Sequence, residues 1–306
     1  MSVRLTWGAG NAALAESIKI YRSDTTFTAS TLPAVLETLA GSATSYDDTT
    51  VVRNQLYYYR VGMIRAGEEL ISELLVMGHY PDTGPGAQKI LRGNWELGYF
   101  GEVAAANLFT SGSLVAQTGH PGGTLGVDTA FTSWFKFVRK GKILFIPNFR
   151  ATINTTWIQL YNLGLVHGSE DAGDTQNIAT FTGYTGPVTQ NKTVTAGAYE
   201  FKVRLPRLSD GPTGDYVTDP AVIASSEWVE LIGRMGATNL LSSPQNKWSD
   251  HVLTNYGNTA TVSFARSQIQ ILMDTSNYMD STVEQLQVNP NSYRYCSWIP
   301  VLELIF

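Results

Sequence analysis

"TSYDDTTVVRNQLYYYRV", residues 44–61, is the stretch that decides the fold of the first part of the chain. From Tyr57 onward the side chains alternate: Tyr57, Tyr59, Val61 and Met63 point one way, and Tyr58, Arg60, Gly62 and Ile64 point the other. A period of two predicts a strand with one face in a core. We expect Tyr59 to fill that core and Tyr58 to be exposed, either as a strand-forming surface residue or as a contact with another subunit.

The segments before this strand carry the same signal. "VRLTW" and "ESIKIYRS" alternate apolar and polar positions, which places Leu5 with Trp7, and Ile18 with Ile20, on one face of a strand. Turn-forming side chains lead into the tyrosine-rich strand, at Asp47, Asp48 and Asn54. Residues 3–80 are therefore predicted to be short β-strands separated by turns.

Length and composition limit the class of protein. A chain of 306 residues is long enough for two domains, because single cores stop growing at about 250 residues. Charged residues make up 15% of it, against roughly 25% in ordinary soluble domains, and this shortage is typical of turn-rich β proteins when Gly, Thr, Ser and Tyr are plentiful. The net charge of -5 comes without a basic block, so the signal of a nucleic-acid binder is missing.

Membrane and redox signals are also missing from the sequence. No apolar run reaches the roughly 18 residues of a membrane span, and Met1 leads into "VRLTW" without the basic and apolar regions of a signal peptide. We therefore expect synthesis in the cytosol and no membrane insertion. Cys296 is the only cysteine, which excludes an intrachain disulfide and a thiolate metal cluster.

The order of the first motifs resembles a known family. A strand tryptophan at Trp7, followed by "IKIYRS", "TSYDDTTV" and "LYYYRV", is similar to a fibronectin type III domain of the bacterial and phage kind. The resemblance implies a β-sandwich in which Trp7 is buried and Tyr57 takes the tyrosine-corner position, where the hydroxyl bonds backbone at the neighbouring corner. A valine there would leave a buried backbone group unpaired, which costs about 1–3 kcal/mol.

A change of composition marks the end of this domain. "HYPDTGPGAQ", residues 79–88, holds two prolines and two glycines where the alternation stops. We predict a fibronectin-like first domain over residues 1–80, a linker over 81–87 and a second domain over 88–306.

Cap and turn residues predict the elements of the second domain. A helix is expected at residues 111–117, capped by Thr110 and closed by Gly119, and a hairpin is expected around residues 139–142. Further helices are expected in "NTTWIQLYNLGL" and "SSEWVELIGRM". Their signals are Asn154 or Thr155 as cap with Gly164 as stop, and Ser226 as cap with Glu227 and Glu230 at the positive end. The chain closes on an apolar strand, "CSWIPVLELIF", which needs a neighbouring strand to cover it.

Motifs across residues 90–306 resemble a module found in virion structural proteins of tailed bacteriophages and their prophage relatives. They are "LGYFGEV", "WFKFVRKGKILFIP", "TTWIQLYNLGLVHG", "YEFKVRLP", "SSEWVELI" and "WIPVLEL". The module is similar in layout to C-type lectin-like α+β folds, with a hairpin, two helices, a loop-rich excursion and a last strand that returns to the first. Ile299 stands where the module usually has an arginine, so a role of that arginine in ordering a ligand loop is not expected here.

A search for catalytic and metal-binding patterns finds none. The chain has no GxxxxGK[ST], HExxH, GxSxG or CxxC motif, and "GHPGGTLG" at residues 119–126 does not sit between a strand and a helix as a phosphate loop does. The histidines share no ligand-like spacing and are interpreted as surface or hydrogen-bonded residues; they are His79, His120, His167 and His251. We expect no catalytic residue, no metal site and no cofactor.

Two groups of side chains remain candidates for binding. The loop acids Glu170, Asp171 and Asp174 are either solvated or ligands of calcium, an ion that prefers hard oxygen ligands. Trp95 and Trp248 lie in polar, loop-like surroundings, where an indole can stack on a sugar or fill a partner's pocket. The tryptophans on predicted strands and helices are assigned to the core.

These patterns and resemblances lead to one functional hypothesis and one alternative. We expect a noncatalytic structural component of a tailed-phage virion (tail, collar, baseplate, fibre or decoration protein), made in the host cytoplasm and held in a symmetric assembly of its own copies and other virion proteins. The low charge agrees, because obligate interfaces are poor in charged residues. The alternative is a receptor-binding adhesin that recognises a host surface glycan through the second domain. The candidate interface or ligand contacts are Tyr58, Trp95 and Trp248, and the structural residues are Trp7 and Tyr57.

Overall fold

The chain folds into mainly β-structure in which nearly all strand pairs are antiparallel. The computed structural model describes residues 2–8, 15–121, 131–173, 183–207, 209–211, 220–232, 234, 270–272, 278–280, 286–287 and 296–306. Contacts between Cα atoms divide the chain into two compact units. The first unit holds residues 1–83, 93–98 and 138–141, and the second holds 84–92, 99–137 and 142–306. A single boundary at residues 81–87 would place the segments 93–98 and 138–141 in the second domain, whereas their contacts place them in the first unit.

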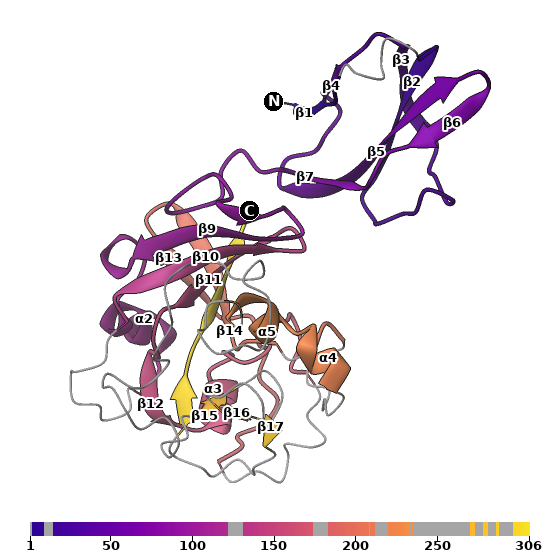
Figure 1. Cartoon of the computed structure of the whole chain (residues 1–306). Helices are drawn as coiled ribbons and strands as arrows, with labels where there is room; N and C mark the ends of the chain where they lie inside the picture. Colours follow the sequence, from indigo (N-terminus) through magenta and orange to yellow (C-terminus); the bar gives the residue numbers. More distant parts are fainter. Residues whose placement is uncertain are drawn as a thin grey trace, which may run out of the picture. The chain divides into compact units, whose positions relative to one another are not determined.

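Within the described residues up to Thr83, the first unit holds two sheets (Figure 1). One pairs β1 (Val3–Thr6) with β4 (Ser45–Asp48). The other has the strand order β3-β2-β5-β6, with β7 also paired to β5. Its strands are β2 (Ser17–Ser23), β3 (Val35–Ala40), β5 (Gln55–Arg65), β6 (Glu68–Ile71) and β7 (Leu75–His79). The long β5 is the tyrosine-rich strand of the sequence, and both β6 and β7 pair along its length.

The core of the first unit lies where the alternation predicts it. Its buried members are Val3, Leu5, Ile18, Ile20, Tyr57, Tyr59 and Val61, and Met63 packs against them. Trp7 differs from the prediction of a buried strand residue: it follows β1 and is half-buried. Its indole N–H donates to the carbonyl oxygen of Ala43 at 2.7 Å, so the ring is held where that backbone group lies, at the edge of the core.

The second unit contains a sheet of seven strands in the order β13-β14-β19-β11-β10-β9-β8, among the residues that the structure describes. They are β8 (Arg92–Gly93), β9 (Leu97–Ala104), β10 (Ser133–Arg139), β11 (Lys142–Pro147), β13 (Thr193–Ala196), β14 (Tyr199–Arg204) and β19 (Val301–Ile305). A smaller sheet has the order β12-β18-β15-β16-β17. Its strands are β12 (Thr152–Thr155), β15 (Gln270–Leu272), β16 (Tyr278–Asp280), β17 (Leu286–Gln287) and β18 (Cys296–Trp298).

Short helices complete this unit, and most of their caps were predicted correctly. They are η1 (Ala105–Asn107), α2 (Ser111–Thr118), α3 (Trp157–Asn162), α4 (Pro220–Ala224) and α5 (Glu227–Leu231). Thr110 caps α2, Gly119 ends it with φ of +74°, and Ser226 caps α5. The cap predicted for α3 is wrong, because Thr155 lies in β12 and Thr156 makes a reciprocal capping box with Gln159.

The predicted hairpin is β10–β11. Its two-residue turn is Lys140–Gly141, and both residues have positive φ, at +49° and +75°. This is the conformation of a type I′ turn, whose twist matches that of the two strands.

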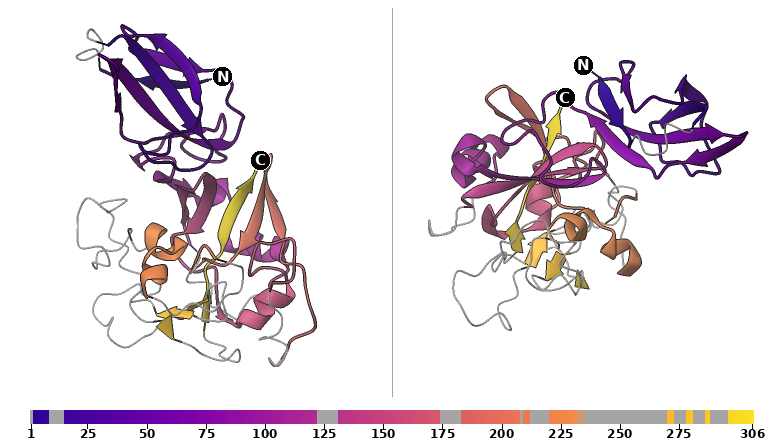
Figure 2. Two further views of the ribbon diagram at one scale, coloured as in Figure 1. Left: turned by 90° about the vertical axis from the view of Figure 1, so that its right-hand side faces the viewer. Right: turned by 45° about the horizontal axis from the view of Figure 1, so that its top comes forward.

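The closing strand β19 lies in the middle of the large sheet, between β14 and β11, where Figure 2 shows it in yellow. Val301 and Leu302 have no exposed surface, so the strand is covered, as its apolar sequence requires. The expectation that it returns to the first strand of the module is wrong. β11 and β14 pair with β19 on its two edges, so the strand is not at an edge of the sheet.

Candidate functional site

The structure brings two of the predicted contact residues, Tyr58 and Trp95, into one cluster of the first unit. We define the Tyr58 cluster as Tyr58, Tyr80, Trp95 and Glu96, all within that unit. The hydroxyl of Tyr58 donates to Glu96 Oε2 at 2.5 Å, and the indole of Trp95 stacks on Tyr80 at 4.8 Å between ring centroids. Both candidate residues are half-buried, so the expectation of an exposed Tyr58 is wrong.

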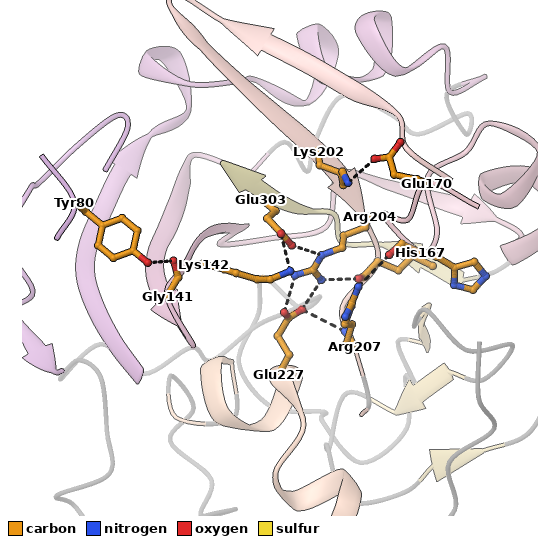
Figure 3. Close-up of polar contacts among 11 residues, drawn as sticks. Tyr80, Gly141, Lys142, His167, Glu170, Lys202, Arg204, Arg207, Glu227 and Glu303 are labelled. Atoms are coloured by element: carbon orange, nitrogen blue, oxygen red, sulfur yellow. Dashed lines mark hydrogen bonds and ion pairs between the residues drawn. The ribbon is translucent and has the colours of Figure 1, made fainter. Parts of the chain in front are cut away.

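A glycine explains how Trp95 reaches this position. Gly78 of β7 lies opposite Leu56 of β5, and a Cβ added to Gly78 would run into the indole of Trp95. The missing side chain leaves the space that the ring occupies. With one indole face on Tyr80, Trp95 has less surface for stacking on a sugar than a loop tryptophan in solvent. Burial raises the pKa of Tyr80 to about 12, and its hydroxyl donates to the carbonyl oxygen of Gly141 at 2.6 Å (Figure 3).

The two structural tyrosines of the first unit use their hydroxyls differently. Tyr57 accepts a hydrogen bond from the backbone N–H of Val52 at 2.8 Å, which is the kind of contact that the tyrosine-corner resemblance implies. Tyr59 is fully buried, as expected of a core residue, but its hydroxyl donates to Asp48 Oδ2 at 2.8 Å. It therefore satisfies a buried carboxylate as well as filling space.

Asp48 joins the two sheets of the first unit. Its side chain has no exposed surface and accepts from Arg22 Nη1 at 2.6 Å as well as from Tyr59. It also accepts from Thr50 N, two residues on, as the turn prediction for this residue anticipated. Burial opposes ionisation of Asp48, but hydrogen bonds from Thr50, Tyr59 and Arg22 outweigh it and lower the pKa. The buried role of Asp48 could not be predicted from the sequence, because nothing local distinguishes a buried turn aspartate from an exposed one.

A second buried group of charges occupies the second unit (Figure 3). We define the Arg204 cluster as Arg204, Glu227, Glu303 and Lys142. The guanidinium of Arg204 makes a bidentate pair with Glu227, at 2.7 Å for each bond, and both side chains are at most 3% exposed. Arg204 Nε donates to Glu303 Oε2 at 3.1 Å, and Lys142 Nζ pairs with Glu303 Oε1 at 2.7 Å.

The Arg204 cluster joins four elements that are far apart in sequence, with Lys142 contributed by β11. Arg204 ends β14, Glu227 begins α5, and Glu303 lies in β19. Burial alone would raise the pKa of Glu303, but Arg204 and Lys142 outweigh it and lower the pKa to about 2. Each charge has a partner, so the group is suited to fixing α5 on the sheet. Each of the three quoted motifs "YEFKVRLP", "SSEWVELI" and "WIPVLEL" carries one of these residues, but no spacing signal connects them.

The predicted acidic loop uses its carboxylates internally. Glu170 pairs with Lys202 at 3.0 Å, and Asp171 accepts from Ser169 Oγ at 2.8 Å and from Gly173 N at 3.1 Å. Asp174 lies outside the described residues. Within the part of the chain that the structure describes, no group of three or more His, Cys, Asp and Glu side chains is arranged to hold a metal ion.

The remaining predicted side chains are mostly core residues. Trp134, Trp157, Trp228 and Trp298 are buried, which confirms their assignment to the core. Trp248 and His251 lie outside the described residues. His79, His120 and His167 are buried, and His120 stacks on Trp298 with ring centroids 4.9 Å apart. The interpretation of the histidines as surface or hydrogen-bonded residues is wrong for His167, whose ring is buried without a hydrogen-bond partner in the described structure.

The charged groups around Asp48 and in the Arg204 cluster pair with one another in the described structure. The Asp48 carboxylate and the Arg204 guanidinium are both engaged by neighbouring side chains. No protein-family model, curated protein or solved structure matches the chain. Among the described helices, none has the length and apolar character needed to cross a membrane.

Proposed function

We propose that this protein is a noncatalytic structural component of a tailed-phage virion, held in a symmetric assembly with its own copies and with neighbouring virion proteins. In this proposal the first unit is a fibronectin type III-like sandwich and the second a C-type-lectin-like module. The pairing of β1 with β4, the order β3-β2-β5 and the Tyr57 contact support the first assignment. The β10–β11 hairpin, the helices α2 and α3 and the loop-rich stretch before β19 support the second.

The observation that carries the proposal is the open edge of β1. In the described structure β1 pairs with β4 alone. Trp7 N donates to Thr44 O, so the alternation of an antiparallel ladder directs the backbone groups of Val3 and Leu5 toward β4 and those of Arg4 and Thr6 away from it. A free edge of this kind is a template for a strand from another chain.

An apolar row lies beside this edge. Residues directly opposite each other in a ladder share a face, so Leu70, Leu75 and Met77 lie on the core side, opposite Met63, Tyr59 and Tyr57. Leu70 is nevertheless 69% exposed, and Leu75 and Met77 are only half-buried. The Asp48–Arg22 pair sets β4 against β2, and β1 contacts β7, so β1 lies near the β7 part of this row, Leu75 and Met77. A strand added to β1 would cover it.

The edge strand β13 of the second unit, unlike β1, has a side chain bonded to its backbone. At β13 the side chain of Gln117 donates to Thr195 O at 3.1 Å and accepts from Thr195 N at 2.9 Å. A side chain thus takes the place that a neighbouring strand would need, which blocks pairing at that position. The contrast favours β1 as the edge that docks.

Proline at the edge tests this proposal. Thr6→Pro removes an N–H that points away from β4, so we expect the folded monomer to keep its thermal midpoint within a few degrees while assembly is lost. Thr6→Ser, which keeps the N–H, is the matched control. The measurement is molar mass by light scattering across a concentration series. A wild-type chain that stays monomeric at high concentration, or a Thr6→Pro chain that assembles like the wild type, would contradict docking through β1.

The adhesin alternative has no observation of its own to favour it, because Trp95 is stacked on Tyr80 and Trp248 is outside the described residues. Mixing the purified protein with host cells and with their surface polysaccharide separates the alternatives. Binding without cleavage would indicate an adhesin, and release of reducing ends would indicate an enzyme. Imaging of the intact particle with a label on this chain tests the virion assignment directly, and absence of the label from purified particles would refute it.

A further inference from the structure

His167 is buried in the second unit with both ring nitrogens unpaired. The residue is 1% exposed, and neither Nδ1 nor Nε2 has a hydrogen-bond partner among the described residues. Its ring meets Trp157 and Tyr161 of α3 edge-to-face, with centroids 5.9 and 6.3 Å apart. An unpaired buried polar group costs about 1–3 kcal/mol when neutral and far more when charged. The site therefore accommodates the neutral imidazole and rejects the imidazolium.

One side of the ring is covered by a short loop, Gly168–Gly173, which we call the 168–173 loop. Gly173 lies directly on the imidazole, since a Cβ added there would be 2.7 Å from Cδ2 and 2.8 Å from Nε2. The loop backbone is held by two hydrogen bonds, from Tyr161 Oη to Ala172 O at 2.9 Å and from Gln190 N to Asp171 O at 2.9 Å. The side chain of Glu170 adds an ion pair with Lys202 at 3.0 Å, and that contact does not depend on the protonation of His167. The opposite side of the ring is packed aromatic core, so the loop is the part that can yield.

The charged groups facing His167 come from two segments. Asp171, on the loop, favours the protonated ring, and Arg207, after β14, disfavours it. From α3 the titratable neighbour is Tyr161, whose hydroxyl is bonded to the loop backbone. Burial is the largest influence and, with Arg207, lowers the pKa of His167 to about 4 against the attraction of Asp171. In Figure 3 the imidazole points away from the Arg204 cluster, while its backbone carbonyl faces Arg207.

We propose that His167 is an acid-released latch for the 168–173 loop. While the imidazole is neutral, Gly173 packs on it and the loop stays closed. A proton on the ring creates a buried cation with no acceptor, and opening of the loop gives that cation access to water and to the carboxylate of Asp171. The open loop therefore binds the proton more tightly than the closed loop does. The free energy of that tighter binding drives the opening. This inference does not depend on the virion assignment.

Cleavage after Glu170 by a glutamate-specific protease reports on the open loop, because the exposed side chain is available in both forms but the backbone that follows it, at Asp171 and Ala172, is hydrogen-bonded in the closed loop. With a histidine pKa of 6.5 in the open form and about 4 in the closed form, linkage predicts opening about twentyfold more frequent at pH 5 than at pH 7. The cleavage rate, divided at each pH by the rate on a free peptide of the same sequence, should rise by that factor. A ratio that does not change between pH 7 and pH 5 would refute the latch.

Two further measurements isolate His167. His167→Phe keeps an aromatic ring that cannot titrate, so its normalised cleavage should be independent of pH, whereas His79→Phe, a buried histidine of the first unit, should behave like the wild type. If His167→Phe does not fold, the carbon-13 signal of the His167 ring in the wild-type protein decides the matter. A titration midpoint near 6.5 in the closed protein would show that the ring is not shielded and would overturn the proposal.

Discussion

At the scale of single residues, Asp48 is a fully buried carboxylate that joins the two sheets of the first unit. Asp48→Asn removes the charge that Arg22, Tyr59 and Thr50 stabilise, and we expect a loss of about 2–3 kcal/mol in the free energy of unfolding at pH 7. Asp47→Asn is the control, since the exposed Asp47–Arg4 pair at 3.5 Å contributes less than about 1 kcal/mol. Urea unfolding of both variants measures the difference.

The same variant makes a prediction about pH. Because the folded pKa of Asp48 lies below its ordinary value of 3.8, its carboxylate stabilises the fold above that pH, and the contribution disappears as the pH falls through the folded pKa. The gap between wild type and Asp48→Asn should therefore be full at pH 5 and narrow below about pH 3.8. An equal gap at pH 3 and at pH 7 would mean that the carboxylate acts through its shape and not through its charge.

The Arg204–Glu227 pair predicts strong non-additivity. Removing either partner leaves a buried charge without its main neighbour, so Arg204→Met and Glu227→Leu should each lose about 3–5 kcal/mol. The double variant replaces both charges by apolar groups and should lose much less than the sum of the two. Glu303 keeps Lys142 as a partner in all three variants. A double-mutant cycle by urea unfolding gives the coupling energy, and additive losses would show that the pair is not a unit.

Single residues also show where sequence reasoning succeeds. Tyr57 and Tyr59 were placed correctly because the alternation along one strand is local. Tyr58 was not, because its partner Glu96 is 38 residues away. The buried roles of Asp48 and Arg204 likewise depend on partners from other elements, and no property of the residues themselves distinguishes a buried, paired charge from a solvated one.

At the scale of elements, the β5–β6 turn carries a residue poorly suited to its conformation. Ala66 has φ of +51° and Gly67 has +79°, the left-handed values of a two-residue type I′ turn. Asparagine tolerates this region better than alanine, so Ala66→Asn should raise the free energy of unfolding by about 1 kcal/mol. Gly67→Ala should lower it by a similar amount. Thermal unfolding of the two variants checks the opposite signs, and a shift in the same direction for both would contradict the turn type.

Caps and turns, which depend on neighbouring residues, were predictable from the sequence. Pairings between strands that are far apart in the sequence were not. The α2 cap, the α5 cap and the β10–β11 turn depend on residues three or fewer positions apart, so the sequence is sufficient. The cap of α3 was misplaced by one or two positions because Asn154, Thr155 and Thr156 all have capping side chains. The central position of β19 depends on β11 and β14, which lie about 100 residues or more before it. Its apolar sequence predicts only that it is covered.

At the scale of the whole molecule, composition and turn signals predicted the mainly β architecture. A chain poor in charge and rich in turn residues has few other ways to bury its apolar side chains. The proline- and glycine-rich stretch at residues 79–88 includes Thr83, after which the chain first passes from one unit to the other. The segments 93–98 and 138–141 join the first unit through contacts such as Tyr58–Glu96 and Tyr80–Gly141, which a linear reading of the sequence does not contain.

The stability of the whole molecule in acid depends on single buried histidines. Burial lowers the pKa of both His120 and His167 to about 4, so the unfolded chain binds their protons more readily, and stability falls as the pH drops from 6.5 toward 4. By pH 5 each should lower the free energy of unfolding by about 2 kcal/mol relative to pH 7. Glu303, whose folded pKa of about 2 lies below its ordinary value of 4.5, adds little between pH 7 and pH 5, and its stabilising effect is lost below that range as the unfolded chain takes up the proton.

The double variant His120→Phe/His167→Phe separates this effect from the titration of acids. Neither phenylalanine binds a proton, so most of the loss between pH 7 and pH 5 should disappear, and what remains should come from His79, whose pKa is also lowered by burial. Urea unfolding at the two pH values measures both losses. If the double variant loses as much stability as the wild type, the acid sensitivity comes from carboxylates, and the buried histidines are protonated without opening the fold.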